Sequence, residues 1–175
     1  MRTFSGFKGS DMQWVQPKAF TRHHELRSGQ DVFATLTWVS VFGSLAEASS
    51  AEGSFTLKRG GFLRPYVTIR DVSTGADIAV LNIGLFRHGT LEFNNGRRIT
   101  LVSTRFWGFE WEFIDENGQT LCVISRRPSF AKHAANVTIS EAVRRDRDML
   151  VMLIVGWYTM VLISDEAAAS AAAAS

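Results

Sequence analysis

The stretch RRDRDMLVMLIVGWYTMVLISDE at residues 144–166 decides the fold. From Met149 to Ile163 it contains no charged residue, and its apolar side chains surround the helix axis instead of forming one stripe. A helix of this kind must be buried on every side. At about 1.5 Å per residue the apolar run is roughly 22 Å long, which is short for a bilayer core of about 30 Å. The run therefore predicts a helix enclosed by protein, and no permanent membrane span is expected.

Most of the chain before this stretch alternates apolar and polar residues in short segments separated by turn residues. Asp31–Trp38 (DVFATLTW) is the strongest segment, because β-branched and aromatic residues dominate it. Together the segments indicate about a dozen strands of roughly five to six residues. Between two of them, Asn95-Gly96 predicts a two-residue type I′ turn, since that turn needs positive φ at both central positions.

These strands and the apolar helix predict one architecture. A closed antiparallel barrel leaves no exposed sheet edge, and about twelve strands enclose an interior too wide for their own side chains to fill. A helix inside the barrel would fill that space. We therefore predict a mainly β protein, a closed antiparallel β-barrel of about twelve strands wrapped around a central hydrophobic C-terminal α-helix near residues 141–164.

One domain is expected, at residues 14–166, after a flexible lead-in at 1–13. The Ala-rich tail at 167–175 is either a frayed continuation of the helix or disordered. Thr138 followed by Glu141 resembles a capping box at the start of the helix. Gly156 predicts a close approach between the helix and a strand, whereas Trp157 and Tyr158 bring large apolar area and a polar atom that needs a partner.

Composition limits the classes of function. The 175 residues have a formal net charge of only +2, so nucleic acid is not an expected partner. The single Cys122 excludes an internal disulfide and agrees with a reducing compartment. Because the N-terminus lacks an apolar signal-peptide region, we expect a cytoplasmic protein, with peripheral attachment to a membrane left open.

Enzyme motifs are missing from the sequence. It contains no GxSxG, Walker, HExxH or CxxC pattern, so we expect no enzyme activity, no cofactor and no metal site. Cys122 lies in an apolar segment and is expected to be a small buried hydrophobe. His23 and His24 would point to opposite faces of a strand and cannot share a metal ion, so both are expected at the surface or rim. His88 and His133 are expected in solvated loops.

Basic residues cluster on two predicted hairpins and are the candidate ligand-binding residues. Such clusters could bind an anionic ligand on the barrel surface. The alternative is that 19 basic and 17 acidic residues merely decorate a soluble protein. The first hairpin carries the candidate site, Lys58, Arg59, Arg64 and Arg70, and the second carries Arg97, Arg98 and Arg105.

Five segments in this order suggest a known family. They are DVFATLTW with SLAEAS (within 31–49), GSFTLKRGGFLRPYVTIR (53–70), TLEFNNGRRITL (90–101), FEWEFIDENGQTL (109–121) and VMLIVGWYTMVLISDE (151–166). Their order, ending in an apolar helix, resembles the Tubby C-terminal-like superfamily, which includes plant LURP-one-related proteins and phospholipid scramblases. The resemblance implies a barrel around a central helix, with basic surface residues that bind phosphoinositide head groups.

The resemblance implies a non-catalytic binding or scaffold module that recognises an anionic phospholipid head group or a protein partner. The alternative is a membrane-attached, scramblase-like lipid-handling protein whose C-terminal helix inserts in the bilayer. Scramblases are associated with a calcium-binding acidic segment before that helix. Here the segment at 141–148 is EAVRRDRD, in which three arginines neutralise the acids, so it does not favour a calcium loop.

Overall fold

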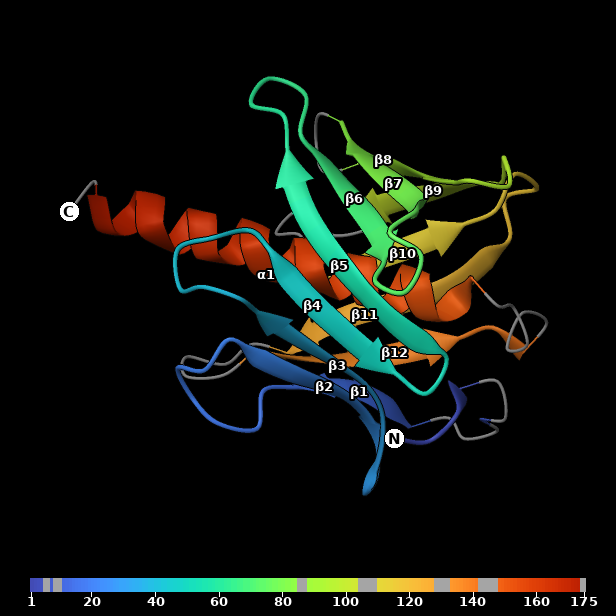
Figure 1. The fold of residues 1–175 in the computed structure, drawn as a ribbon, viewed down its shortest axis with the longest axis horizontal. Helices are drawn as coiled ribbons and strands as arrows, with labels where there is room; N and C mark the ends of the chain where they lie inside the picture. Colours follow the sequence, from blue (N-terminus) through green and yellow to red (C-terminus); the bar gives the residue numbers. More distant parts are fainter. Residues whose placement is uncertain are drawn as a thin grey trace.

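The protein is a closed barrel of antiparallel strands around one helix (Figure 1). The computed structural model describes residues 1–4, 7, 11–84, 88–103, 110–127, 133–141 and 148–173. Within these residues each strand pairs with the next along the chain, and β1 pairs with β12 to close the barrel. The predicted fold class is confirmed. The strands are β1 (Met12–Val15), β2 (His23–Ser28), β3 (Asp31–Trp38), β4 (Ala46–Ser50), β5 (Gly53–Gly60), β6 (Tyr66–Asp71), β7 (Asp77–Ile83), β8 (Gly89–Phe93), β9 (Arg98–Ser103), β10 (Glu110–Ile114), β11 (Thr120–Arg127) and β12 (Ala134–Ile139).

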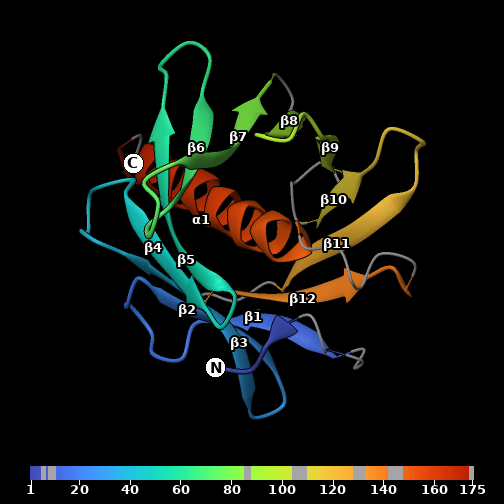
Figure 2. The ribbon, with the colours of Figure 1, turned by 45° about the vertical axis from the view of Figure 1, so that its right-hand side comes forward.

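The helix α1 (Met149–Ala173) runs through the barrel and emerges at one end (Figure 2). Every residue from Met149 to Leu162 is buried. Because the strands supply apolar side chains around the whole helix, it needs no polar face. The helix continues to Ala173, so the Ala-rich tail extends it past the expected end at 164.

The start of the helix differs from the prediction. Thr138 does not cap it, because this residue lies in β12 and pairs with Val123 of β11. The backbone N–H of Met152 instead donates to the carbonyl oxygen of Asp148 at 3.0 Å, which places the first helical turn after Asp148. The Asp148 carboxylate also pairs with Arg97 at 2.9 Å, and this ion pair ties the helix start to the β8–β9 turn.

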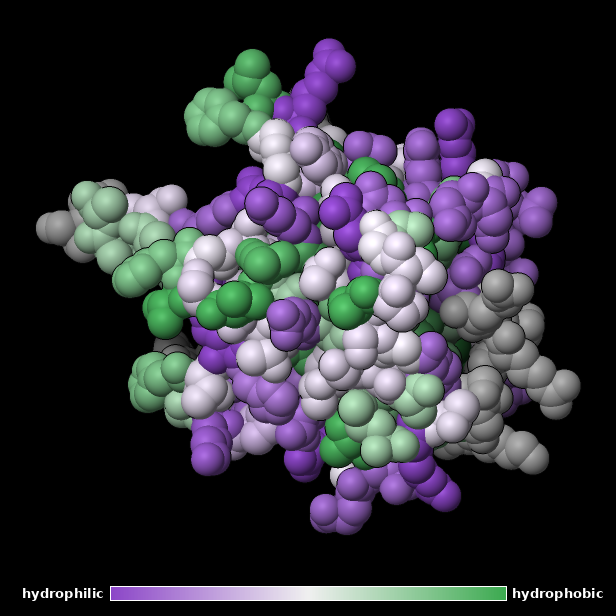
Figure 3. Space-filling view, in the orientation of Figure 1, coloured by the Kyte–Doolittle hydropathy of each residue, from purple (hydrophilic) through white to green (hydrophobic). Residues whose placement is uncertain are grey.

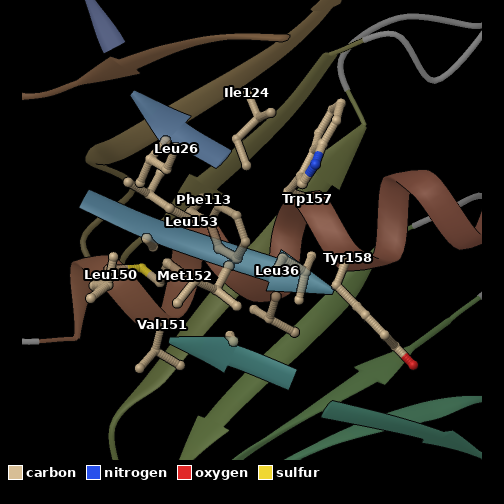
Figure 4. Close-up of a cluster of buried hydrophobic side chains, with 14 of the residues drawn as sticks. Leu26, Leu36, Phe113, Ile124, Leu150, Val151, Met152, Leu153, Trp157 and Tyr158 are labelled. Atoms are coloured by element: carbon tan, nitrogen blue, oxygen red, sulfur yellow. The ribbon is translucent and has the colours of Figure 1, made fainter. Parts of the chain in front are cut away.

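Large side chains from the helix and the strands interlock in the barrel interior (Figure 4). Trp157 stacks on Trp14 with ring centroids 6.0 Å apart, and Tyr158 stacks on Trp38 at 5.5 Å. A Cβ atom added to Gly156 would lie 2.8 Å from a ring carbon of Phe113. The predicted close approach of helix and strand at Gly156 is therefore confirmed.

The polar atoms of Trp157 and Tyr158 differ in their hydrogen bonding. The Tyr158 hydroxyl donates to the carbonyl oxygen of Ser44, and burial raises its pKa to about 12. The Trp157 Nε1–H has no hydrogen-bond partner in the described part of the chain. The prediction that both polar atoms find a partner is correct for Tyr158 only.

The hairpin at Asn95-Gly96 has a different turn from the predicted type I′. Gly96 has φ +85°, but Asn95 is not among the described residues with positive φ. The N–H of Gly96 donates to the Phe93 carbonyl at 2.9 Å, and Phe93 N–H donates to Arg97 O at 2.9 Å. These bonds define a three-residue loop with a turn followed by a left-handed glycine, so only Gly96 meets the requirement for positive φ.

Two further predicted boundaries, of a turn and of the lead-in, differ from those in the structure. Lys58-Arg59-Gly60-Gly61 is not a turn, because β5 continues to Gly60 and pairs there with Tyr66 of β6. The lead-in is shorter than 1–13, since β1 begins at Met12, and before it Phe4 is buried against the ring of Phe33. Trp14 docks in the core as expected and is fully buried.

We expect Val155→Asp or Leu153→Asp to prevent folding. Both side chains are fully buried within the barrel, and an unpaired buried charge costs several kcal/mol against a total domain stability of about 5–15 kcal/mol. Circular dichroism during thermal unfolding should show no cooperative transition. The matched control is Ala168→Asp on the exposed part of the same helix, which should change stability by about 0.5 kcal/mol or less. Cooperative unfolding of both buried variants would contradict the enclosed helix.

Gly96→Val should lower the free energy of unfolding by about 1 kcal/mol or more, because a β-branched residue resists positive φ. Crowding is not the cause, since an added Cβ would meet no atom within 4 Å. Gly96→Asn should cost less, because Asn tolerates the left-handed region. Equal urea midpoints for the Val and Asn variants would show that backbone strain at Gly96 is unimportant.

Candidate functional site

The barrel has an open end from which the helix emerges, which we call the mouth. Strands β1, β3 and β5 end there, and the loops that follow them surround the opening. We call the loops 16–22, 39–45 and 61–65 the rim loops. Together with the helix residues from Val161 to Ser170 they line a cavity of about 1120 Å³.

Two arginines from the barrel wall hold the emerging helix at the mouth. Arg22 Nη2 lies 3.0 Å from Asp165 Oδ2, and Arg59 pairs with Glu166. The Arg22 guanidinium also lies over the Trp38 ring, 4.9 Å from its centroid. These contacts tie two acidic residues of the emerging part of the helix to β5 and to the loop after β1.

Arg126 and His133 complete this polar network. Arg126 Nη1 donates to Ser164 Oγ at 2.7 Å, and its Nη2 lies 3.0 Å from His133 Nδ1. His133 Nε2 lies 3.5 Å from Asp165 Oδ1. Burial lowers the pKa of Arg126, and the charge of Asp165 opposes that shift. His133 is therefore a partly buried member of the network and not the solvated loop residue that was expected, whereas His88 is exposed as expected.

His24 lies on the inner face of β2 and lines the mouth cavity. It is buried, with its ring between the aromatic rings of Trp38 and Trp157 at centroid distances of 5.5 and 5.6 Å. Burial, and then the nearby His133, lower its pKa to about 3, so the ring is neutral. Among the described residues its Nδ1 has no hydrogen-bond partner. The expected surface or rim position is wrong for His24, whereas His23 is on the outside.

The candidate basic residues lie on two faces of the β5–β6 hairpin. Lys58 and Arg70 are exposed on the outer face, where they border a recess of about 300 Å³. We call this the outer recess. It is also bordered by Thr56, Thr68 and Tyr66, and no Asp or Glu of the described residues lines it. Because alternate strand residues share a face, the pairing of Lys58 with Thr68 and of Thr56 with Arg70 brings these side chains together.

The other predicted basic residues are placed differently. Arg59 borders the outer recess, but its guanidinium is engaged with Glu166 at the mouth. Arg64 is exposed in the loop 61–65 and does not line the recess. On the second hairpin Arg98 pairs with Glu92 at 3.5 Å, and Arg97 pairs with Asp148. Arg105 lies outside the described residues. The six described bases therefore do not form one patch.

Exposed apolar side chains on the rim loops are the feature that sequence reasoning missed. The sequence could have indicated them, because apolar residues occur there within short segments bounded by Gly and Pro, such as Gly61-Phe62-Leu63-Arg64-Pro65. Segments of this kind cannot extend a strand. Residues in such a loop have no core to enter. The exposed large apolar residues of the rim loops are Phe20, Val39, Val41, Phe42, Leu45, Phe62 and Leu63.

Among the described residues, no group of three His, Cys, Asp or Glu side chains could hold a metal ion. Cys122 is buried in β11, in agreement with its expected role as a small hydrophobe. The described surface offers cations and hydroxyls in the outer recess and apolar side chains at the mouth.

The class of protein is defined by its architecture, an antiparallel barrel of neighbouring strands in sequence order closed around its own C-terminal helix. No protein-family model, curated protein or solved structure matches the chain.

His24 should make the protein sensitive to acid. Its folded pKa of about 3 lies below the ordinary histidine value of 6.5, so between these values the unfolded chain binds a proton that the folded chain excludes. Stability should therefore fall as pH decreases from about 6.5 towards 3. In urea unfolding at several pH values, His24→Phe should flatten this dependence relative to the parent. His23→Phe, on the outer face of the same strand, should retain it, and equal slopes for all three proteins would contradict the assignment.

Proposed function

We propose that the protein is a non-catalytic binding module of the Tubby-like type that recognises an anionic phospholipid head group. The observation that carries the proposal is the outer recess. Lys58 and Arg70 border it together with three hydroxyl-bearing side chains, and none of its described lining residues is acidic. Phosphate oxygens are bound by charge-assisted hydrogen bonds from Lys and Arg, so this lining suits a phosphorylated head group.

The geometry of the recess supports recognition beyond simple attraction between charges. Arg70 Nε donates to Asp77 Oδ1 at 2.7 Å, and this contact orients the guanidinium beside the recess. Thr56 and Thr68 lie on neighbouring strands of the same rigid hairpin. Groups that are held in place before the ligand arrives lose less conformational entropy on binding, so a sheet surface is a favourable platform for a small anion.

The second candidate function is the membrane-attached, scramblase-like one, and the burial of the helix argues against it. In the described part of the chain, α1 alone is long and apolar enough to cross a membrane, and 78% of an apolar stretch of 18 residues within it is buried inside the barrel. Withdrawing it would expose that apolar surface and the matching interior of the barrel to water. The recess, by contrast, is available without any rearrangement.

The test uses a soluble phosphorylated inositol as the probe, because it presents head-group chemistry without a bilayer. Isothermal titration calorimetry at 0.1 M salt should detect binding by the parent protein. Lys58→Ala/Arg70→Ala should weaken it by about tenfold or more, since each charge-assisted contact contributes about 1.5–3 kcal/mol. Binding should also weaken at 1 M salt, where the Debye length falls from about 10 Å to about 3 Å.

The control double variant is Arg2→Ala/Arg98→Ala. It removes the same amount of charge from exposed residues outside the outer recess, so it should bind like the parent. Equal loss in both double variants would mean that net charge alone drives binding. If the parent binds neither the soluble probe nor any anionic liposome at low salt, the lipid proposal is wrong and a protein partner becomes the leading alternative.

A further inference from the structure

The rim loops present an unusual amount of apolar surface to solvent. Phe42 is 101% exposed, Phe62 98% and Phe20 92%, so these rings make almost no contact with the rest of the chain. Figure 3 shows hydrophobic side chains at the tip of the β5–β6 hairpin and around the end where the helix emerges. Large exposed apolar patches mark interaction sites in soluble proteins. The five most exposed of these residues lie on three separate loops and are Phe20, Val41, Phe42, Phe62 and Leu63, which we call the apolar rim.

The apolar rim is shared by three loops that are separate in the sequence. Phe20 follows β1, Val41 and Phe42 follow β3, and Phe62 and Leu63 follow β5. Because all three strands end at the mouth, their loops face the same direction. An approaching surface therefore meets these loops together with the exposed, uncharged helix segment from Ala167 to Ala173, which projects past them (Figure 1).

Charge is distributed unevenly between the two ends of the barrel. The three rim loops contain the bases Lys18, Arg22 and Arg64 and no acid. The helix brings Asp165 and Glu166 to the mouth, where they pair with Arg22 and Arg59. The described turns at the opposite end include the acids Glu52, Asp115 and Glu116 and the base Arg97, which is paired with Asp148. An anionic surface would therefore be attracted more strongly to the mouth than to the described turns at the opposite end, and this difference orients the approaching protein.

We propose that the apolar rim inserts into the interfacial region of an anionic lipid bilayer, with the barrel standing on its mouth. This inference rests on the proposed head-group recognition and assigns its ligand to a membrane instead of to free solution. The outer recess adjoins the mouth, because Gly60 and Tyr66 border the recess at the end of the hairpin from which the rim loop begins. Phe62 and Leu63 then enter the interface while Lys58 remains at the level of the head groups.

The combination of residues favours a bilayer over a second copy of the chain. Aromatic and apolar side chains flanked by Lys and Arg are the composition of interfacial membrane anchors, and each such base near an anionic surface strengthens attachment. Two copies meeting mouth to mouth would instead bring the basic rim loops of both copies together. Arg64 follows Leu63 directly, so this like-charge contact would lie beside the apolar one.

Insertion is measured with vesicles of phosphatidylcholine and phosphatidylserine whose acyl chains carry bromine, a short-range quencher of tryptophan. Phe62→Trp places a reporter at the rim, and Val72→Trp places one on an exposed apolar position of the β6–β7 turn at the opposite end. The additional fluorescence of each variant is its signal minus that of the parent. Addition of vesicles should quench the additional fluorescence of Phe62→Trp and leave that of Val72→Trp unchanged. Absence of quenching at position 62 in vesicle-bound protein would overturn the insertion.

Vesicle flotation supplies the second readout. Phe62→Ser/Leu63→Ser should reduce the bound fraction, with an apparent partition coefficient lower by about tenfold or more, whereas Val72→Ser should match the parent. Parent-like flotation of the double serine variant would contradict the proposal. Sedimentation velocity without vesicles tests self-association, and a parent dimer that becomes monomeric in the serine variant would assign the rim to a second copy instead.

The two proposals fail in different ways. If the soluble inositol phosphate binds but the tryptophan at position 62 is not quenched, head-group recognition stands and the membrane inference is wrong. If quenching is normal but the soluble probe does not bind, the rim inserts while the outer recess has no head-group role. In that case Phe62→Trp combined with Lys58→Ala/Arg70→Ala should be quenched as strongly as Phe62→Trp alone, which separates insertion from recognition.

Discussion

The burial of an all-apolar helix inside the barrel is the constraint on which the rest of the structure depends. Twelve strands enclose more space than their own side chains fill, and a helix without a polar face has no stable place in water. The helix therefore fills the interior of the barrel, and the barrel shields the apolar helix from water. Ion pairs join the helix to the barrel at its two openings, Arg97 with Asp148 at one and Arg22 with Asp165 at the other.

Occupation of the interior limits where a ligand can bind. A barrel of this size could hold a ligand at its centre, but here Trp157, Tyr158 and their neighbours fill that volume. Binding chemistry is left to the outer wall and to the mouth. Both proposed contact regions, the outer recess and the apolar rim, belong to these surfaces, and the β5–β6 hairpin contributes to each of them.

The candidate site was predictable only in part. Lys58 and Arg70 could be associated from the sequence because a short hairpin brings alternate residues of its two strands onto one face. Arg59 is the next residue along, so its side chain leaves that face and meets Glu166, a partner 107 residues away that no local pattern indicates. The exposed Phe42 and Phe62 were also missed, because apolar residues normally suggest a core and only the loop geometry shows that they cannot reach it.

The sequence by itself determined the elements and the fold class. Alternation predicted strands such as Asp31–Trp38, and the uncharged run from Met149 predicted an enclosed helix, because both depend on periodicity and on the cost of exposing apolar surface. Only the tertiary structure decided that His24 faces inward, that the Asn95-Gly96 loop has one left-handed residue, and that the helix begins after Asp148. These features depend on strand register and on contacts between residues far apart in the chain, and local propensity carries no information about such contacts.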